Sequence, residues 1–335
     1  MIAAAVAAVL LTAAGSGAQG LSTYEGLVNQ YAAGDAAAAV STLVTWPMTT
    51  VTTDAANRSR LLPPARQRAA VMLHTDAAYV CLTVNRTADA ATHVSIARRI
   101  LGTLRATSLR DERAQMFEAR WYAFVASMYT ALGQLTQADL IVRDGLGLYA
   151  RDARLHVARG SIREMNVAMT YVEQSSGKEI ARASRELDAA AADFRRAIGY
   201  DATLAVAHLH LGWVRFLGRD DRSLHDFEAA LEHASHERTR YLAHLFLGAF
   251  AERHDRLEDA RREYEAALGI GPGWQSGFVA LSRVEEALGH SARAQELARD
   301  YAARPAKPED PWWDYHLGGF DQETLEWLRR EAMIP

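Results

Sequence analysis

Histidine offers this chain most of its potential for acid–base or metal chemistry, with 12 copies in 335 residues. His208 and His210 are two positions apart, so on a helix their side chains point to different faces and cannot hold one ion together. His233 and His236 share a face, but a metal site needs two further ligands from elsewhere. We therefore predict no bound metal, and we expect the second pair at helix ends, where a helix C-terminus favours positive charge.

Nucleophilic chemistry has one superficial candidate, Ser175-Ser176-Gly177-Lys178, which spells the Ser-x-x-Lys arrangement of acyl-transfer enzymes. Its companion motifs are missing and it falls at the tip of an expected helical hairpin, so we interpret it as coincidence. The sequence has no His-Glu-x-x-His motif, Walker loop or Gly-x-Ser-x-Gly motif. Cys81 is the single cysteine, which excludes a disulfide framework. These observations predict a protein that is not an enzyme and carries no cofactor.

The charge pattern argues against nucleic acid as a partner. The chain is 49% hydrophobic and 23% charged with a net charge of −4, an ordinary balance for a folded protein. Runs such as 252–256 and 258–263 mix both signs at helical spacing, as solvated helix faces do. No basic stripe is present, so neither nucleic acid nor an anionic membrane surface is an expected partner.

The elements that would position a site come from an internal repeat. The segment DFRRAI at 193–198 returns as DFEAAL at 226–231 and as EYEAAL at 263–268. Phe194 and Phe227 are 33 residues apart and Phe227 and Tyr264 are 37 apart, spacings typical of helical solenoids. Leu-Gly pairs at 211–212 and 247–248 alternate with these segments. Strand-type runs are nearly absent, so we predict an all-α fold of at least thirteen helices in antiparallel pairs, with no sheet.

In its repeats the chain resembles the tetratricopeptide repeat (TPR) family. The best match has Leu247-Gly248, Ala260, Tyr264 and Ala267 before Pro272, and Ala260 to Ala294 spans the 34 residues of the family's repeat. The resemblance implies a right-handed α-solenoid of about seven helical hairpins over residues 19–303. The region 47–64, rich in Pro and Thr, is expected to be a loop, and residues 165–187 an insertion in the fourth repeat.

The two ends of the chain differ from the repeats. Residues 1–18 combine a short apolar run with small residues at a Ser-x-Ala cleavage site, which predicts a signal peptide, although no basic residue precedes the run. Export to the periplasm or the exterior follows, with no membrane span in the mature chain. Residues 304–335 are expected to form a Pro-rich linker and a capping segment. There, Trp312 and Trp313 either fold back on the last repeats or bind a ligand.

The resemblance also implies a binding groove, because in TPR arrays the first helix of each repeat lines the concave surface. Mapping through Leu211-Gly212 gives candidate groove positions in the third, fifth and sixth repeats: Arg120, Ser127, Val206, Leu209, Trp213, Phe216, Leu242 and Leu245. Apolar and aromatic side chains on such a wall suit a peptide. For Trp213 and Phe216, packing against the enlarged fourth repeat or the C-terminal tail is an equal alternative.

These expectations favour a non-catalytic scaffold that binds a protein or peptide, in the envelope of a bacterium. Two alternatives stay open: an enzyme whose site is formed by the fourth-repeat insertion and the C-terminal tail, and a self-assembling structural subunit. An enzyme should show a pocket with convergent polar groups, whereas a scaffold should show an open groove. The partner, the oligomeric state and the pathway are not encoded in any motif that we can identify.

Overall fold

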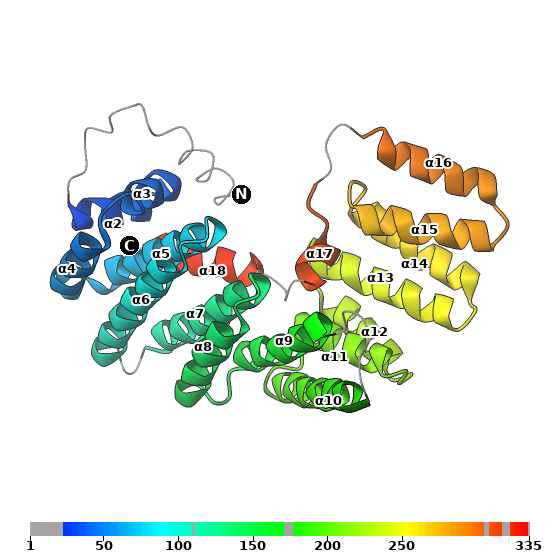
Figure 1. Cartoon of the computed structure of the whole chain (residues 1–335), viewed down its shortest axis with the longest axis horizontal. Helices are drawn as coiled ribbons and strands as arrows, with labels where there is room; N and C mark the ends of the chain where they lie inside the picture. The colour runs from blue at the N-terminus through cyan, green and yellow to red at the C-terminus, as the bar shows by residue number, and fades with distance from the viewer. Residues whose placement is uncertain (1–22, 109–110, 171–176, 305–307, 317–321, 334–335) are drawn as a thin grey trace. The chain divides into compact units, whose positions relative to one another are not determined.

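The structure is a computed structural model that describes residues 23–108, 111–170, 177–304, 308–316 and 322–333. Over these ranges it contains helices and turns and no β-strand (Figure 1). The predicted all-α fold class is therefore confirmed. The predicted signal peptide, residues 1–18, lies outside the described residues.

Consecutive helices form seven hairpins, as the repeat pattern predicts. The pairs are α2 (Tyr24–Ala32) with α3 (Ala36–Leu43), α5 (Pro64–Thr83) with α6 (Thr87–Thr107), α7 (Glu112–Ala131) with α8 (Leu135–Leu148), α9 (Ala153–Thr170) with α10 (Gly177–Tyr200), α11 (Ala205–Leu217) with α12 (Ser223–His233), α13 (Glu237–Arg253) with α14 (Leu257–Ile270), and α15 (Gln275–Ala287) with α16 (Ser291–Ala302). Outside the hairpins lie α4 (Met48–Arg58), the 3₁₀ turn η1 (Ser59–Leu61), α17 (Pro311–His316) and α18 (Gln322–Met333).

The turns inside the hairpins share one backbone device. Two positions after the first helix ends, a residue adopts the left-handed region, and these residues are Gly34, Asn85, Gly133, Arg219, Asp255 and Gly289. In each case the next residue's amide donates to the carbonyl five positions back, as from Gln134 to Tyr129 at 2.8 Å. This hydrogen bond satisfies a carbonyl that the helix end would leave unpaired. The same hydrogen-bonded turn therefore reverses the chain direction between the two antiparallel helices in six of the seven hairpins.

In the fourth, fifth and sixth hairpins, close packing of a glycine against an aromatic ring explains the repeated sequence. A Cβ placed on Gly160 would lie 2.4 Å from the ring of Phe194, and one on Gly212 would lie 2.6 Å from the ring of Phe227. Both rings are fully buried. The first helix thus supplies the glycine and the second supplies the aromatic ring, which lets the two backbones approach closely.

The segment 47–64 differs from its predicted loop conformation, because most of it forms α4. Val51 and Ala55 are buried one helical turn apart, so the helix gains an apolar face that holds it to its neighbours. Thr52 and Thr53 donate their hydroxyls to carbonyls four positions back, which satisfies their polar atoms within the helix. The prolines at 47, 63 and 64 flank this helix and do not interrupt it.

The chain divides into two compact units, and the boundary lies inside α7. Unit 1 comprises residues 1–121 together with 322–335, and unit 2 comprises residues 122–321. The C-terminal tail therefore does not act as one cap: α17 belongs to unit 2, whereas α18 packs on α5 and α2 in unit 1. In unit 1, Arg329 reaches Asp76 at 2.9 Å and Glu331 accepts a bidentate pair of hydrogen bonds from Arg113.

The fourth hairpin, with 18 residues in α9 and 24 in α10, is longer than the three hairpins that follow it. Residues 171–176, which join these helices and contain part of the Ser-x-x-Lys sequence, lie outside the described residues. None of the helices that the structure describes is long and apolar enough to cross a membrane.

Candidate functional site

The short helix α17 lies against the first helices of four successive hairpins in unit 2. Its residues contact α9, α11 and α13, and Asp310, directly before it, contacts α15; these four helices also pack on one another in that order. Figure 1 shows α17 beside α13, separate from the hairpins themselves. A stretch of chain outside the repeats thus covers the first helices of these hairpins.

Asp310 fixes the N-terminal end of α17. Its carboxylate is buried and accepts hydrogen bonds from the amide of Trp312 at 2.9 Å and from the amide of Ser276, at the start of α15, at 2.6 Å. An Asp at the N-cap followed by Pro311 at the first helical position is a favourable helix start. One carboxylate therefore begins α17 and attaches it to the seventh hairpin.

The middle of α17 rests on an aromatic cluster centred on Trp213 of α11. The Trp213 ring stacks on Phe246 of α13 at 4.7 Å and on Phe216 at 5.4 Å between centroids. Trp312 meets the Trp213 ring edge-on at 5.4 Å, a preferred geometry for aromatic pairs. On the other side of α17, Asp314 forms an ion pair with Arg238 of α13. Aromatic packing and an ion pair therefore both hold α17 on this surface.

Tyr315, near the end of α17, belongs to a buried polar group with residues of α9 and α11. Its hydroxyl donates to Glu164 Oε1 at 3.1 Å, while Glu164 Oε2 lies 2.8 Å from His210 Nδ1. The His210 ring is stacked between Phe194 and Tyr315, at centroid distances of 5.1 and 4.6 Å. Burial, and next the charge of Glu164, raise the pKa of Tyr315 well above its ordinary value. The phenol therefore stays protonated and remains a donor.

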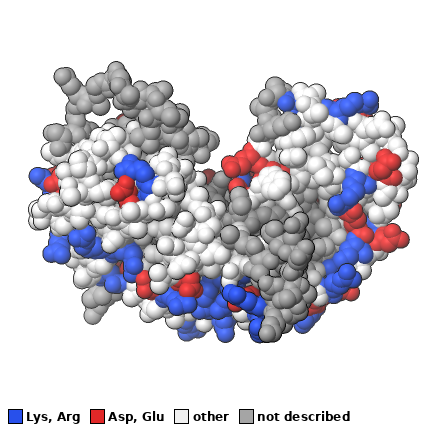
Figure 2. All heavy atoms as spheres, in the orientation of Figure 1, with Lys and Arg blue, Asp and Glu red and all other residues white. Residues whose placement is uncertain are grey.

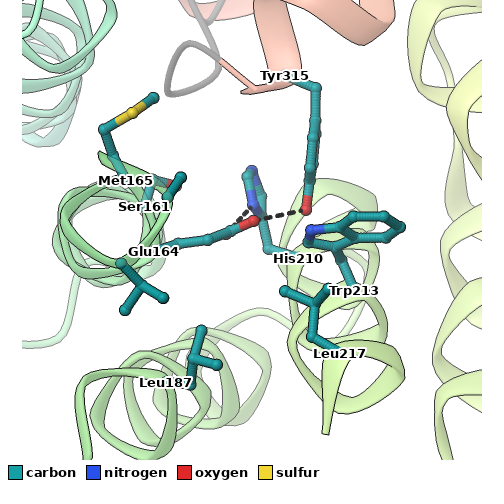
Figure 3. A pocket seen from close by; sticks show the side chains of 10 residues that line it. Ser161, Glu164, Met165, Leu187, His210, Trp213, Leu217 and Tyr315 are labelled. Carbon is teal, nitrogen blue, oxygen red and sulfur yellow. Dashed lines mark hydrogen bonds and ion pairs between the residues drawn. The ribbon is translucent and has the colours of Figure 1, made fainter. Parts of the chain in front are cut away.

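A pocket of about 320 Å³ opens beside this polar group (Figure 3). Its walls come from α9, α10, α11 and α17, and its apolar lining is Met165, Val167, Ala168, Leu187, Trp213 and Leu217. Glu164, His210 and Tyr315 meet on one side of it, where Glu164 hydrogen-bonds both of the other two side chains, as the dashed lines in Figure 3 mark. The arrangement suits binding of an apolar group whose polar end reaches that side.

The candidate groove residues of α11 and α13 lie in this region, but most of them are not exposed. Leu209, Leu242 and Leu245 are 2%, 7% and 4% exposed, so they pack in the core of unit 2 and do not line an open surface. The first helices are covered both by the neighbouring hairpins and by α17, which the repeat pattern does not reveal. Val206 is half-buried and packs against the cluster around Phe194.

Trp213 and Phe216 are half-buried, and different side chains cover their rings. Trp213 lies under Trp312 and Tyr315 of α17, whereas the Arg253 guanidinium lies 4.0 Å over the Phe216 ring. Packing against the C-terminal tail, one of the two alternatives for Trp213, therefore describes this structure. Whether the pair also takes part in ligand binding stays a prediction.

The third-repeat candidates fall in different units. Arg120 belongs to unit 1, where its guanidinium lies 4.1 Å over the ring of Trp327 in α18. Ser127 belongs to unit 2 and is 7% exposed.

The histidine expectations are partly met. His233 is the last residue of α12, as expected for a helix end, and His236 is the N-cap of α13. The structure gives no group of three or more potential metal ligands among the residues it describes. His210, set aside because of its spacing from His208, is the histidine that contributes to the pocket.

Glu164, Arg238 and Asp310 were not predicted as site residues. The Asp310-Pro311 pair is a recognisable helix start, so α17 itself could have been found from sequence. Glu164 and Tyr315 are separated by 151 residues, and no local pattern connects them.

Seven hairpins, left-handed turns and glycine-to-ring packing define an all-α helical-repeat protein whose fold is similar to that of TPR proteins. No protein-family profile matches the chain, and no curated protein matches it. Among solved structures it is similar to PilF of Pseudomonas aeruginosa, with a TM-score of 0.48 and 15% identity over 63% of this chain and 89% of that one. A tetratricopeptide repeat protein from Parabacteroides merdae gives 0.43 and 12% over 77% and 99%.

The human IFIT1 dimer with m7Gppp-AAAA is also similar, with a TM-score of 0.44 and 17% identity over 71% of this chain. The alignment spans 58% of the IFIT1 chain, and the bound molecule is a property of that protein.

Proposed function

We propose that the protein is a non-catalytic scaffold that binds a protein or peptide on the first helices of unit 2. The observation that carries this proposal is the position of α17, a short segment that lies across α9, α11, α13 and α15 as a bound peptide would. The surface offers aromatic rings for apolar side chains and Arg238 for a carboxylate.

The charge distribution supports a protein partner. In the right-hand part of Figure 2, acidic and basic side chains lie close together. Ion pairs such as Arg215 with Asp226 and Arg283 with Glu252, both at 2.6 Å, neutralise charge locally. Sequence-independent binding of nucleic acid depends on uncompensated basic residues, which this pattern does not favour.

A display library of peptides selected on the full chain tests the proposal. We expect enriched peptides that bind the wild-type chain and lose at least tenfold in affinity to an Arg238→Glu variant. Arg299→Glu, on the surface of α16, is the matched charge reversal and should leave binding unchanged. Failure to enrich any peptide, or equal effects of the two reversals, would contradict the proposal.

The pocket gives the enzyme alternative a specific observation, because it is formed by the fourth hairpin and the C-terminal tail as that alternative requires. We favour binding because both carboxylate oxygens of Glu164 are already engaged, one with His210 and the other with Tyr315. Hydrolysis of simple p-nitrophenyl esters that disappears in a folded His210→Gln variant would favour the enzyme. Sedimentation of a concentrated sample as a discrete oligomer would favour the self-assembling subunit.

Export to the periplasm or the exterior of a bacterium is part of the same proposal and rests on residues 1–18. N-terminal sequencing of the native protein should find a mature chain that begins near Gln19. An intact Met1 in protein recovered from the cytosol would contradict export.

A further inference from the structure

We propose that α17 is a built-in ligand of unit 2 and that the partner is a peptide of the same chemistry, which must displace it. The recognised pattern has two aromatic residues three positions apart, as Trp312 and Tyr315 are, with an acidic residue just before the second, as Asp314 is. This inference rests on the proposed function and adds to it the chemical class of the partner and an autoinhibitory contact.

The residues of α17 that contact the neighbouring helices differ from those that face solvent. Tyr315 is 5% exposed, and Trp312 packs edge-on against both Trp213 and Phe246, at 5.4 and 5.5 Å. Trp313, the adjacent tryptophan, is 54% exposed. Two chemically identical neighbours thus differ only in whether they face the helices, so the surface selects a spacing and not tryptophan content alone.

An acidic group between the two anchors is selected by Arg238 of α13. Burial lowers the pKa of this guanidinium, and Glu309 and Asp310 act in the opposite direction. Its ion pair with Asp314 lies at the rim of the aromatic cluster, since the two side chains are 29% and 19% exposed. A partner without a carboxylate here would leave a half-buried positive charge without its counter-ion, which penalises the wrong peptide.

The helical form of α17 depends on the surface that it covers. A helix of six residues is unstable alone in water, because the nucleation cost exceeds the gain of so few hydrogen bonds. Displacement by a peptide of similar chemistry exchanges one set of contacts for another and leaves the hairpins intact. The pocket beside Tyr315, about 320 Å³ in volume, gives a partner with a larger apolar side chain at that position additional burial.

A tethered ligand competes at the effective concentration set by its linker, on the order of 1 mM for short flexible tethers. A free peptide that binds the open surface with a dissociation constant of about 10 μM would then bind the wild-type chain roughly a hundredfold more weakly. A variant in which α17 no longer covers the surface should therefore bind the free peptide more tightly than the wild-type chain does.

The experiment uses a fluorescent peptide of residues 308–316, PEDPWWDYH, and the full chain. We expect the triple variant Trp312→Ala, Asp314→Ala, Tyr315→Ala to bind this peptide at least tenfold more tightly than the wild-type chain. A peptide with Trp313→Ala should bind like the original, whereas one with Trp312→Ala and Tyr315→Ala should not bind. Circular dichroism confirms that the triple variant is folded.

A charge exchange tests the acidic position. Adding Arg238→Glu to the triple variant should weaken the original peptide at least tenfold, and a peptide with Asp314→Arg should recover most of that loss. If the triple variant does not fold, Asp314→Ala alone should still increase peptide binding severalfold. In the wild-type chain, saturating peptide should then increase hydrogen exchange of the α17 amides.

Equal and weak binding to the wild-type chain and a folded triple variant would overturn the inference, since α17 would then be a permanent part of the fold. A concentration-dependent dimer of the triple variant with its own copies, without peptide binding, would also overturn it. The proposed function fails separately, when library selection yields no binder. Selected binders that leave hydrogen exchange of α17 unchanged would refute this inference and leave the proposed function standing.

Discussion

Gly248 in α13 lies directly against the ring of Tyr264 in α14, so that a Cβ at residue 248 would come within 2.3 Å of Tyr264 Cε1. Tyr264 is 1% exposed and its hydroxyl donates to Glu252 at 2.9 Å, so the ring is fixed and cannot move aside. The same contact occurs in the two preceding hairpins, with phenylalanine in place of tyrosine. The sequence motif therefore repeats because each of these three hairpins packs a glycine against an aromatic ring in the same way.

Gly248→Ala should therefore lower the free energy of unfolding by about 1–3 kcal/mol, because the methyl group forces the Tyr264 ring off its position. The matched control is Gly269→Ala in α14, where an added Cβ would meet no atom within 4 Å. That change should be neutral or stabilise by up to about 1 kcal/mol through helix propensity. Urea unfolding followed by circular dichroism measures both. Equal effects would show that the glycine is not selected by packing.

Trp213→Ala should destabilise unit 2 by about 3 kcal/mol, since the ring stacks on Phe246 and supports Trp312. Trp313→Ala is the control, and its exposed ring should contribute less than about 0.5 kcal/mol. Thermal melting of the two variants distinguishes a packed ring from a ligand-facing one. A melting temperature unchanged by Trp213→Ala would place this ring at an open binding surface.

Unit 1 should lose stability in mild acid because of two buried histidines. His74 Nδ1 lies 2.9 Å from His93 Nδ1, and the Tyr24 hydroxyl lies 3.0 Å from His74 Nε2. Burial lowers the pKa of His93 to about 4, and burial followed by the charges of His93 and Arg99 lowers the pKa of His74. The unfolded chain takes up these protons near pH 6.5, so the folded state is disfavoured as the pH falls from there to about 4.

For His93 alone, lowering the pKa from 6.5 to about 4 corresponds to a loss of roughly 3 kcal/mol in the free energy of unfolding, at 1.36 kcal/mol per pKa unit. This loss is complete near pH 4. Urea unfolding at pH 7.5 and pH 4.5 measures the loss, and His93→Gln should reduce the difference between the two values. His225→Gln, at an exposed position of α12, should leave it unchanged. A pH dependence that is the same in all three chains would rule out the buried pair as its source.

Asp193 should be essential to the fourth hairpin, because its buried carboxylate accepts hydrogen bonds from Arg159, Arg163 and Arg196. Burial alone would raise its pKa, but the His156 side chain 3.9 Å away, the hydrogen bonds from Arg159 and the positive charges of Arg159 and Arg163 outweigh it and lower the pKa to about 2. Its contribution is therefore present above pH 3.8 and is lost as the pH falls towards 2.

Asp193→Asn leaves three guanidinium groups without their counter-ion and should cost roughly 3 kcal/mol. Asp188→Asn, on the exposed side of α10, should change the free energy of unfolding by less than about 0.5 kcal/mol. Denaturation at pH 7 compares the two. A loss below 1 kcal/mol for Asp193→Asn would show that the three arginines are sufficiently solvated without it.

The sequence predicted the hairpins because their signals are local. The segment at 226–231 and the Leu-Gly pair at 211–212 belong to adjacent helices, so the residues that pack together are close in the chain. The segment 47–64 was mistaken for a loop because threonine and proline dominate its composition. Its helix depends on burial of Val51 and Ala55, which is a tertiary contribution.

The sequence placed the candidate groove on α7, α11 and α13, and the structure shows that several of these positions are buried. Periodicity identifies which side of α11 and α13 faces inward, yet it cannot tell that α17 covers that side and that Leu242 and Leu245 are buried. Only the tertiary structure placed Tyr315 on Glu164, 151 residues away, and Arg329 on Asp76, 253 residues away. Caps and hydrophobic periodicity act over a few residues, whereas the position of a short amphipathic helix depends on which distant surface buries it best.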